Sequence, residues 1–246
     1  MSKIIVPDGN SAQSKKVQVE NMFDSIAPKY DLLNHTLSLN IDKIWRRKVV
    51  RIVNKKSPQQ VLDVATGTAD LAIATARKIN LQKINGIDLS EEMLNIGREK
   101  IAKLGLTGKI ELQKADAECI PFADNTFDAI TVAFGARNFE NLEAGLNEMQ
   151  RVLKPNGICV VLEFTMPTVF PVKQLYNFYF RRILPLIGKK ISQSETAYTY
   201  LPESVQAFPQ RADFLQIMNK CGFVGTYFRS LSFGIAAIYV GVKQAN

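Results

Sequence analysis

The feature that most constrains the fold is a regular alternation of short apolar runs and longer amphipathic stretches between residues 60 and 163. The apolar runs have the length of buried strands, and the stretches between them have helical spacing. The predicted strands are 60–64, 84–87, 110–113, 128–133 and 157–163, and the predicted helices are 69–79, 91–104 and 142–153. Strands that alternate with helices form a parallel sheet, because right-handed crossovers place the helices on both of its faces. We therefore expect a doubly wound α/β fold.

The segments on either side of this alternation complete the predicted architecture. A helix at about 209–221 precedes two strands at 223–231 and 235–243, which "SFG" joins into an antiparallel hairpin. The sheet is thus expected to have seven strands, most of them parallel. The other segments are a flexible tail at 1–16, a helical cap at 17–56, an inserted helical lid at 166–208 and one domain that spans 17–246.

Composition indicates an ordinary globular protein and excludes several other classes. Hydrophobic residues make up 46% of the 246 residues and charged residues 22%. The three cysteines, Cys119, Cys159 and Cys221, form no CxxC pair, so neither a disulfide framework nor a metal site is expected. We expect Cys119 to be a small buried hydrophobe. With no apolar run of 18 residues and no signal-like N-terminus, the expected location is the cytoplasm.

The net charge of +8 favours anionic partners without identifying them. Nucleic acid and anionic lipid headgroups both fit this charge. The basic stretch "WRRKVVRIVNKK" (45–56) is typical of the solvated face of an amphipathic helix. Because the chain has no recognisable RNA-binding motif, no nucleic-acid partner is expected.

The stretch "VLDVATGTADLA" (61–72) indicates a ligand site at the end of the first strand. Gly67 permits close approach of the backbone there, and the next helix begins with free N–H groups. Asp88 ends the second strand, 25 positions after Asp63. An acid in that position is placed to accept hydrogen bonds from the two hydroxyls of a ribose.

Missing glycines narrow the choice of cofactor. A dinucleotide site needs G-x-G-x-x-G, whereas "ATGTAD" has one glycine, and no P-loop motif occurs. An adenosine without phosphates remains, which S-adenosylmethionine carries. After the third strand, Asp116 is placed to recognise the exocyclic amine of adenine, and the small side chain of Ala117 leaves room for the ring.

The ordered set of these acids, the glycine turn and "RVLKPNG" resembles a class I S-adenosylmethionine-dependent methyltransferase, and more closely the ubiquinone/menaquinone biosynthesis C-methyltransferase family. The resemblance covers about Met22 to Lys243. Three of its motifs, "FDSIAPKYDLLNHTLSLNIDKIWRR", "FGARN" and "YTYLPESVQAFP", are more specific to the quinone group. The others are "VLDVATGTADL", "DLSEEML", "ADAECIPFADNTFD" and "RVLKPNG" followed by "LEF".

This resemblance implies that Gly67 and Thr68 meet the methionine portion of the cofactor, that Asp88 holds the ribose, and that Asp116 and Ala117 border the adenine. The full set of expected cofactor-binding residues is Asp63, Gly67, Thr68, Asp88, Asp116, Ala117 and Ala133. The chain departs from the family at several positions. These are Ala65 and Ala69 in place of frequent glycines, Asn40 and Asp42 in place of a common Gly and His, and Ala133 in place of a serine that touches the cofactor.

The activity that the resemblance implies is methylation of a ring carbon of a polyprenyl hydroquinol. Loss of a phenolic proton raises the electron density at the neighbouring ring carbon, which then attacks the methyl group. Our first expectation is conversion of demethylmenaquinol to menaquinol. The first alternative substrate is the benzoquinol of ubiquinone biosynthesis. An RNA or a soluble small molecule is a further alternative.

Arg137 and Asn138 of "FGARN" are the expected catalytic residues. Arg137 is placed to stabilise the phenolate through a charge-assisted hydrogen bond, although arginine is a poor base unless it orients a water. The alternative for Arg137 is a salt bridge to an acid such as Glu140, and the alternative for Asn138 is a helix cap. Tyr30 and Tyr200 are expected to line the substrate mouth, with core packing as their alternative.

The inserted segment supplies aromatic residues beside basic ones. They are Phe170, Tyr176, Phe178, Tyr179 and Phe180, followed by Arg181, Arg182, Lys189 and Lys190. Two interpretations stay open, an interfacial lid for a membrane-borne substrate and a helix packed on the sheet. Under the first, the protein is peripheral at the inner face of the membrane. The sequence does not indicate the oligomeric state.

Overall fold

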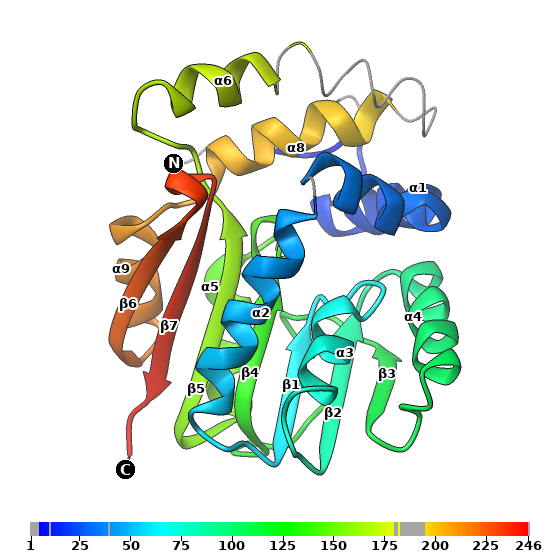
Figure 1. Cartoon of the computed structure of the whole chain (residues 1–246), viewed down its shortest axis with the longest axis vertical. Coiled ribbons are helices and arrows are strands. Elements are labelled where there is room, and N and C mark those ends of the chain that lie inside the picture. The colour runs from blue at the N-terminus through cyan, green and yellow to red at the C-terminus, as the bar shows by residue number, and fades with distance from the viewer. Residues whose placement is uncertain (1–4, 10, 39, 180–181, 183–194, 246) are drawn as a thin grey trace.

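The computed structural model describes residues 5–9, 11–38, 40–179, 182 and 195–245. The described strands form one seven-stranded sheet in the order β3-β2-β1-β4-β5-β7-β6 (Figure 1). They are β1 (Gln60–Val64), β2 (Lys83–Asp88), β3 (Ile110–Lys114), β4 (Phe127–Ala133), β5 (Leu153–Phe164), β6 (Phe223–Leu231) and β7 (Ala236–Lys243). Strands β1 to β5 pair in parallel, and β7 pairs antiparallel with both β5 and β6. The expected sheet is confirmed.

The helices follow the predicted order. They are α1 (Lys15–Leu37), α2 (Ile41–Asn54), α3 (Asp70–Ala76), α4 (Glu91–Lys103), α5 (Leu142–Val152), α6 (Val172–Phe178), α8 (Glu195–Ala207) and α9 (Ala212–Lys220), with short 3₁₀ turns η1 (Ala136–Asn138) and η3 (Ser232–Gly234). The helical stretch expected at 17–56 consists of two helices, since Asn40 has a left-handed backbone (φ 59°) immediately before α2. Because α1 begins at Lys15, the last two residues of the expected tail are helical.

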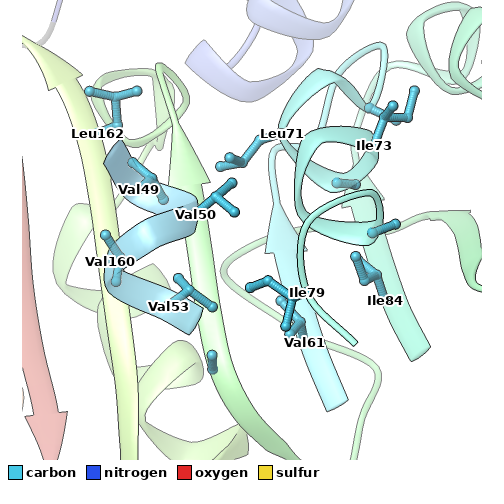
Figure 2. Close-up of a cluster of buried hydrophobic side chains, with 14 of the residues drawn as sticks. Val49, Val50, Val53, Val61, Leu71, Ile73, Ile79, Ile84, Val160 and Leu162 are labelled. Carbon is cyan, nitrogen blue, oxygen red and sulfur yellow. The ribbon is translucent and has the colours of Figure 1, made fainter. Parts of the chain in front are cut away.

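Two apolar layers, one on each face of the sheet, hold this fold together. On one face, Val49, Val50 and Val53 of α2 pack with Val61 of β1 and Ile84 of β2 (Figure 2). The second layer includes Leu62, Ile130, Leu146, Met149, Phe214 and Met218, from β1, β4, α5 and α9. Fully burying each such side chain contributes about 1.5–3 kcal/mol. Helices on both faces explain why the central strands are rich in apolar residues on both sides.

The basic stretch of α2 is only in part a solvated face. Arg47 and Arg51 are exposed as expected, but Arg46 is buried, with 7% of its surface exposed. Its guanidinium forms an ion pair with Asp42 one helical turn earlier. It also lies 5.5 Å from the centre of the Phe134 ring. The expectation is therefore wrong for Arg46, because a pair and an aromatic face replace its water.

Cys119 is exposed, so the expectation that it is buried is wrong. It lies in the turn after β3, where Asp116 and Cys119 form an isolated bridge, and not in a strand. Cys159 and Cys221 are buried, and burial raises the pKa of the Cys159 thiol to about 12. In the inserted segment, Phe180, Arg181, Lys189 and Lys190 lie outside the described residues. No helix in the described ranges is both long enough and apolar enough to span a bilayer.

Candidate active site

A pocket opens at the carboxyl ends of the parallel strands, and α1 forms one of its walls. Figure 1 shows α1 and α8 lying over this end of the sheet. The pocket lining includes seven of the residues expected from the sequence, namely Tyr30, Gly67, Asp88, Asp116, Ala117, Ala133 and Asn138. Four others are not in the lining, namely Asp63, Thr68, Arg137 and Tyr200. Within the described ranges, no cluster of side chains suited to a metal ion is found.

The turn between β1 and α3 has a backbone that favours glycine at three alternating positions. Gly67 has φ +55°, and the flanking Ala65 and Ala69 have φ values of 52° and 65°. An L-residue in this region is strained by roughly 1–2 kcal/mol. The N–H of Gly67 donates to Oδ2 of Asp88 at 2.7 Å, so this contact joins the turn to the end of β2. The two departures from the family's glycines therefore occur where the backbone is least suited to alanine.

Asp88 places its carboxylate in the pocket wall, where it can accept further hydrogen bonds. Its Oδ2 accepts from Gly67, and its Oδ1 accepts from the N–H of Ser90 at 3.0 Å. Burial raises the pKa of Asp88, and these backbone hydrogen bonds oppose the rise. Because a carboxylate has about four acceptor positions, the backbone N–H groups of Gly67, Leu89 and Ser90 leave capacity for a ligand donor.

Asp63 does not line the pocket but stabilises the turn beneath it. It is 2% exposed and accepts from the hydroxyls of Thr66 at 2.7 Å and Thr131 at 2.6 Å. Burial raises its pKa to about 6, although both hydroxyls act in the opposite direction. These hydrogen bonds connect the β1–α3 turn to β4, so Asp63 fixes the turn that carries Gly67.

Thr68 is likewise bound to protein groups. Its hydroxyl donates to Asp31 of α1 at 2.5 Å and accepts from Lys100 of α4 at 3.1 Å. Asp31 and Lys100 also pair directly at 2.8 Å. Thr68 therefore connects the turn with α1 and α4.

The first turn of α1 covers the side of the pocket formed by β3. The Nζ of Lys16 forms an ion pair with Asp116 and lies 3.7 Å from the carboxylate of Glu118. The hydrogen bond to Asp116 raises the pKa of Lys16. The sequence prediction placed this lysine in a tail, because the polar, aperiodic segment before it gives no helix signal.

Lys15 occupies a half-buried position beside the turn that follows β4. Its ammonium donates to the carbonyl oxygens of Arg137 at 3.1 Å and Phe139 at 2.7 Å. Its backbone N–H donates to Glu140 at 3.0 Å. Burial, followed by the nearby charge of Arg137, lowers the pKa of the Lys15 ammonium to about 8.

Arg137 pairs with Glu163 of β5, and not with Glu140. The distance from Nη1 of Arg137 to Oε1 of Glu163 is 2.9 Å. The side chains are 7% and 0% exposed, respectively. The salt bridge that was the alternative for Arg137 is therefore present, but its acid is Glu163 at the carboxyl end of the neighbouring strand and not Glu140.

Asn138 lies in η1 and does not cap a helix. The cap of α5 is Asn141, whose Oδ1 accepts from the N–H of Ala144 at 3.1 Å. The Oδ1 of Asn138 instead accepts from the hydroxyl of Tyr200 at 3.2 Å, which joins α8 to the pocket wall. Burial raises the pKa of Tyr200 to about 12, while Arg137 acts in the opposite direction.

The close approach of Gly135 to Ala65 gives a testable prediction about the pocket floor. A Cβ added to Gly135 would overlap the Cβ of Ala65, while its next neighbour, Val132, would be in ordinary contact. We expect Gly135→Ala to lower the free energy of unfolding by about 1–3 kcal/mol. Ala65→Gly removes the overlapping methyl group and relieves the left-handed strain, so the double variant should recover most of the loss. Thermal unfolding with and without cofactor measures both effects, and a double variant no more stable than Gly135→Ala would contradict this account.

Comparisons with known proteins agree with this geometry. The model of the "ubiE/COQ5 methyltransferase family" matches residues 11–243. A "Demethylmenaquinone methyltransferase" of Bacteroides fragilis is 48% identical over 239 residues, which cover 97% of each chain. A "Ubiquinone/menaquinone biosynthesis C-methyltransferase UbiE" of Geotalea daltonii is 46% identical over 93% of this chain and 97% of its own.

The solved structures support the same fold. A SAM-dependent methyltransferase from Aquifex aeolicus superposes with a TM-score of 0.56 at 21% identity, covering 80% of this chain and 88% of its own. At that identity the likeness bears on architecture alone.

Proposed function

The chain belongs to the ubiE/COQ5 methyltransferase family, and from this membership we propose that it transfers a methyl group from S-adenosylmethionine to a ring carbon of demethylmenaquinol. The observation that carries the proposal is the pocket that brings Gly67 and Asp88 together with Asn138 at one edge of the sheet. The relatives named for demethylmenaquinone and for both quinones supply the substrate class.

The residues of the pocket fit the proposed cofactor. Asp88 retains acceptor capacity in the pocket wall, which suits the hydroxyls of a ribose. Asp116 and Ala117 line the side where the adenine would bind, and Gly67 lines the side of the methionine portion. When bound, S-adenosylmethionine supplies a methyl group that its sulfonium activates toward a nucleophile. Asp63 and Thr68 act indirectly in this proposal, since their hydrogen bonds hold the turn.

The protein contributes mainly by holding the ring beside the cofactor pocket, because alignment of two reactants accounts for much of the acceleration in such a transfer. Tyr30 and Asn138 line the pocket, and Tyr200 is hydrogen-bonded to Asn138. We assign the ring to this side. There the guanidinium of Arg137 favours the ionised phenol, whose loss of a proton activates the neighbouring carbon.

Methyl transfer to a reduced naphthoquinol is the direct test. Purified protein is incubated with S-adenosylmethionine labelled in its methyl group and with demethylmenaquinol under strong reductant. The label should appear in menaquinol, and much less should appear when the quinone is left oxidised, because the oxidised ring lacks a phenolic proton to lose. Absence of label from the naphthoquinol in the presence of reductant would refute the proposal. A parallel reaction with the demethylated benzoquinol separates the ubiquinone alternative.

We also propose that an exposed apolar patch contacts an anionic membrane surface from which the polyprenyl substrate enters. The patch consists of Val169, Phe170, Leu175, Phe178 and Phe233, whose exposed fractions run from 57% to 76%. The segment that leads into α6 lies beside η3, because the hydroxyl of Thr165 donates to the carbonyl of Gly234 at 2.7 Å and Pro167 lies next to Gly234. Figure 1 shows α6 at the same end of the sheet as the pocket. The net charge of +8 complements anionic headgroups.

Vesicle binding tests the membrane proposal. We expect the protein to float with vesicles that contain anionic lipid, and Phe170→Ser with Phe178→Ser to weaken this binding by about tenfold or more, since each ring loses about 1.5–3 kcal/mol of apolar burial. The matched control is Val224→Ser on β6, an exposed apolar residue outside the patch. Equal binding by the patch variant and the control would contradict the assignment.

A further inference from the structure

Glu163 is a fully buried carboxylate that the function proposed above does not use. It lies near the end of β5, beside the turn that follows β4, and its side chain is 0% exposed. A carboxylate in such a place is unfavourable unless donors surround it. The groups that donate hydrogen bonds to Glu163 therefore indicate its role.

Glu163 accepts hydrogen bonds from both the backbone and the side chain of Arg137. Its Oε2 accepts from the backbone N–H of Arg137 at 3.2 Å, and its Oε1 accepts from Nη1 of Arg137 at 2.9 Å. Its Oε1 also accepts from the N–H of Phe164 at 2.8 Å, which fixes the carboxylate itself. Glu163 thus sets the place of η1, including the pocket residue Asn138, as well as the direction of the guanidinium.

The guanidinium of Arg137 retains unused donors on Nε and Nη2, because its side-chain hydrogen bonds to the described residues all come from Nη1. Nη1 is committed to Glu163 and to the carbonyl oxygen of Phe134. The carbon of the guanidinium lies 5.6 Å from the centre of the Phe164 ring. Nε is buried and has no hydrogen-bond partner among the described residues. A buried donor without an acceptor is unfavourable, so an incoming acceptor at this place gains from pairing with it.

We propose that Glu163 is a positioning residue, which holds Arg137 so that one of its remaining N–H groups donates to the phenolic oxygen of the ring substrate. This inference rests on the proposed function. Glu163 does not itself touch the substrate in this arrangement, because its oxygens already accept three N–H groups. As the phenolic oxygen becomes negative, the hydrogen bond from the guanidinium strengthens, so the benefit falls mainly on the transition state.

Glu163→Gln tests this inference, because it keeps the size of the side chain and removes its charge. We expect kcat to fall by about tenfold or more while KM for the quinol changes little, as for an interaction made mainly in the transition state. The pH at which kcat rises should also shift upward, since a misplaced guanidinium no longer favours the ionised form of the bound phenol. Affinity for S-adenosylmethionine, measured by calorimetry, should stay within about twofold.

The matched control is Glu148→Gln. Glu148 also pairs with an arginine, Arg151 at 2.8 Å, and accepts from a backbone N–H, that of Ile120 at 2.8 Å, but it lies on α5 outside the pocket lining. The Glu148→Gln variant should be less stable than the wild type, without any change in kcat or in the pH profile of kcat. If Glu163→Gln shows the same pattern as this control, the inference is overturned.

The wild-type activity separates failure of the proposed function from failure of this inference. If the wild-type protein does not methylate the quinol, the proposed function fails, whereas an active wild type with an equally active Glu163→Gln contradicts this inference alone. Should Glu163→Gln not fold, Glu163→Asp is used, which keeps the charge and withdraws it by one bond. That variant should bind cofactor and lose kcat. A failure of both variants to fold shows that Glu163 is a structural residue, which also overturns the inference.

Discussion

Asp88→Ala is expected to weaken binding of S-adenosylmethionine by about a hundredfold or more. The carboxylate lies in the pocket wall, where we propose that it accepts from the two ribose hydroxyls in addition to its backbone donors. A hydrogen bond to a charged group contributes about 1.5–3 kcal/mol, so the loss of two amounts to at least about 3 kcal/mol. The variant also removes the acceptor of the Gly67 N–H, which loosens the turn in the same direction. Calorimetry on the folded variant measures the effect.

Asp63→Asn is the matched control for that measurement. Both acids lie at or near the end of neighbouring parallel strands, Asp63 buried and Asp88 half-buried, yet the hydroxyls of Thr66 and Thr131 occupy Asp63. We expect its affinity for the cofactor to stay within a few-fold of wild type. Equal losses in the two variants would mean that the ribose is not held by Asp88 in particular, and would contradict the assignment of the pocket.

The sequence predicted the sheet well because the relevant signal is local. Each of the apolar runs at 60–64, 110–113 and 128–133 became a strand within a residue or two of its expected bounds. The hairpin at the C-terminus was also foreseen, whereas its insertion order, with β7 between β5 and β6, depends on contacts distant in sequence. The break between α1 and α2 was missed because it depends on one left-handed residue, Asn40.

For the site, the sequence predicted which residues line the pocket better than it predicted the ion pairs that lie behind the lining. Gly67 and Asp88 lie in the lining as expected, because strand ends at the same edge of a parallel sheet converge. The pair of Arg137 with Glu163 was missed, although "LEF" was noted, because register between β4 and β5 decides which acid faces the arginine. The contributions of Lys15 and Lys16 were missed for a different reason, namely that both fall in the polar segment before the predicted helical cap, whereas α1 begins at Lys15.

Asp63→Asn is expected to change how stability depends on pH. The pKa of Asp63 is about 6 in the folded protein, against an ordinary value of 3.8, because burial disfavours the charged form. The folded state therefore holds this proton more tightly than the unfolded chain does. The resulting stabilisation is complete below about pH 4 and is lost as the pH rises through 6. The whole difference corresponds to about 3 kcal/mol.

In the asparagine variant this contribution disappears, and the two threonine hydroxyls can rotate to pair with an amide. The wild-type free energy of unfolding, measured with urea at pH 4 and pH 7, should fall by about 3 kcal/mol more over this interval than that of Asp63→Asn. Asp128→Asn gives a control of opposite sign. Although burial alone would raise the pKa of Asp128, hydrogen bonds from Lys154, Gln60 and Gln59 lower it, so its contribution is present at neutral pH and lost in acid. Parallel curves for wild type and Asp63→Asn would show that Asp63 stays ionised throughout, and that the hydroxyls of Thr66 and Thr131 compensate fully for its burial.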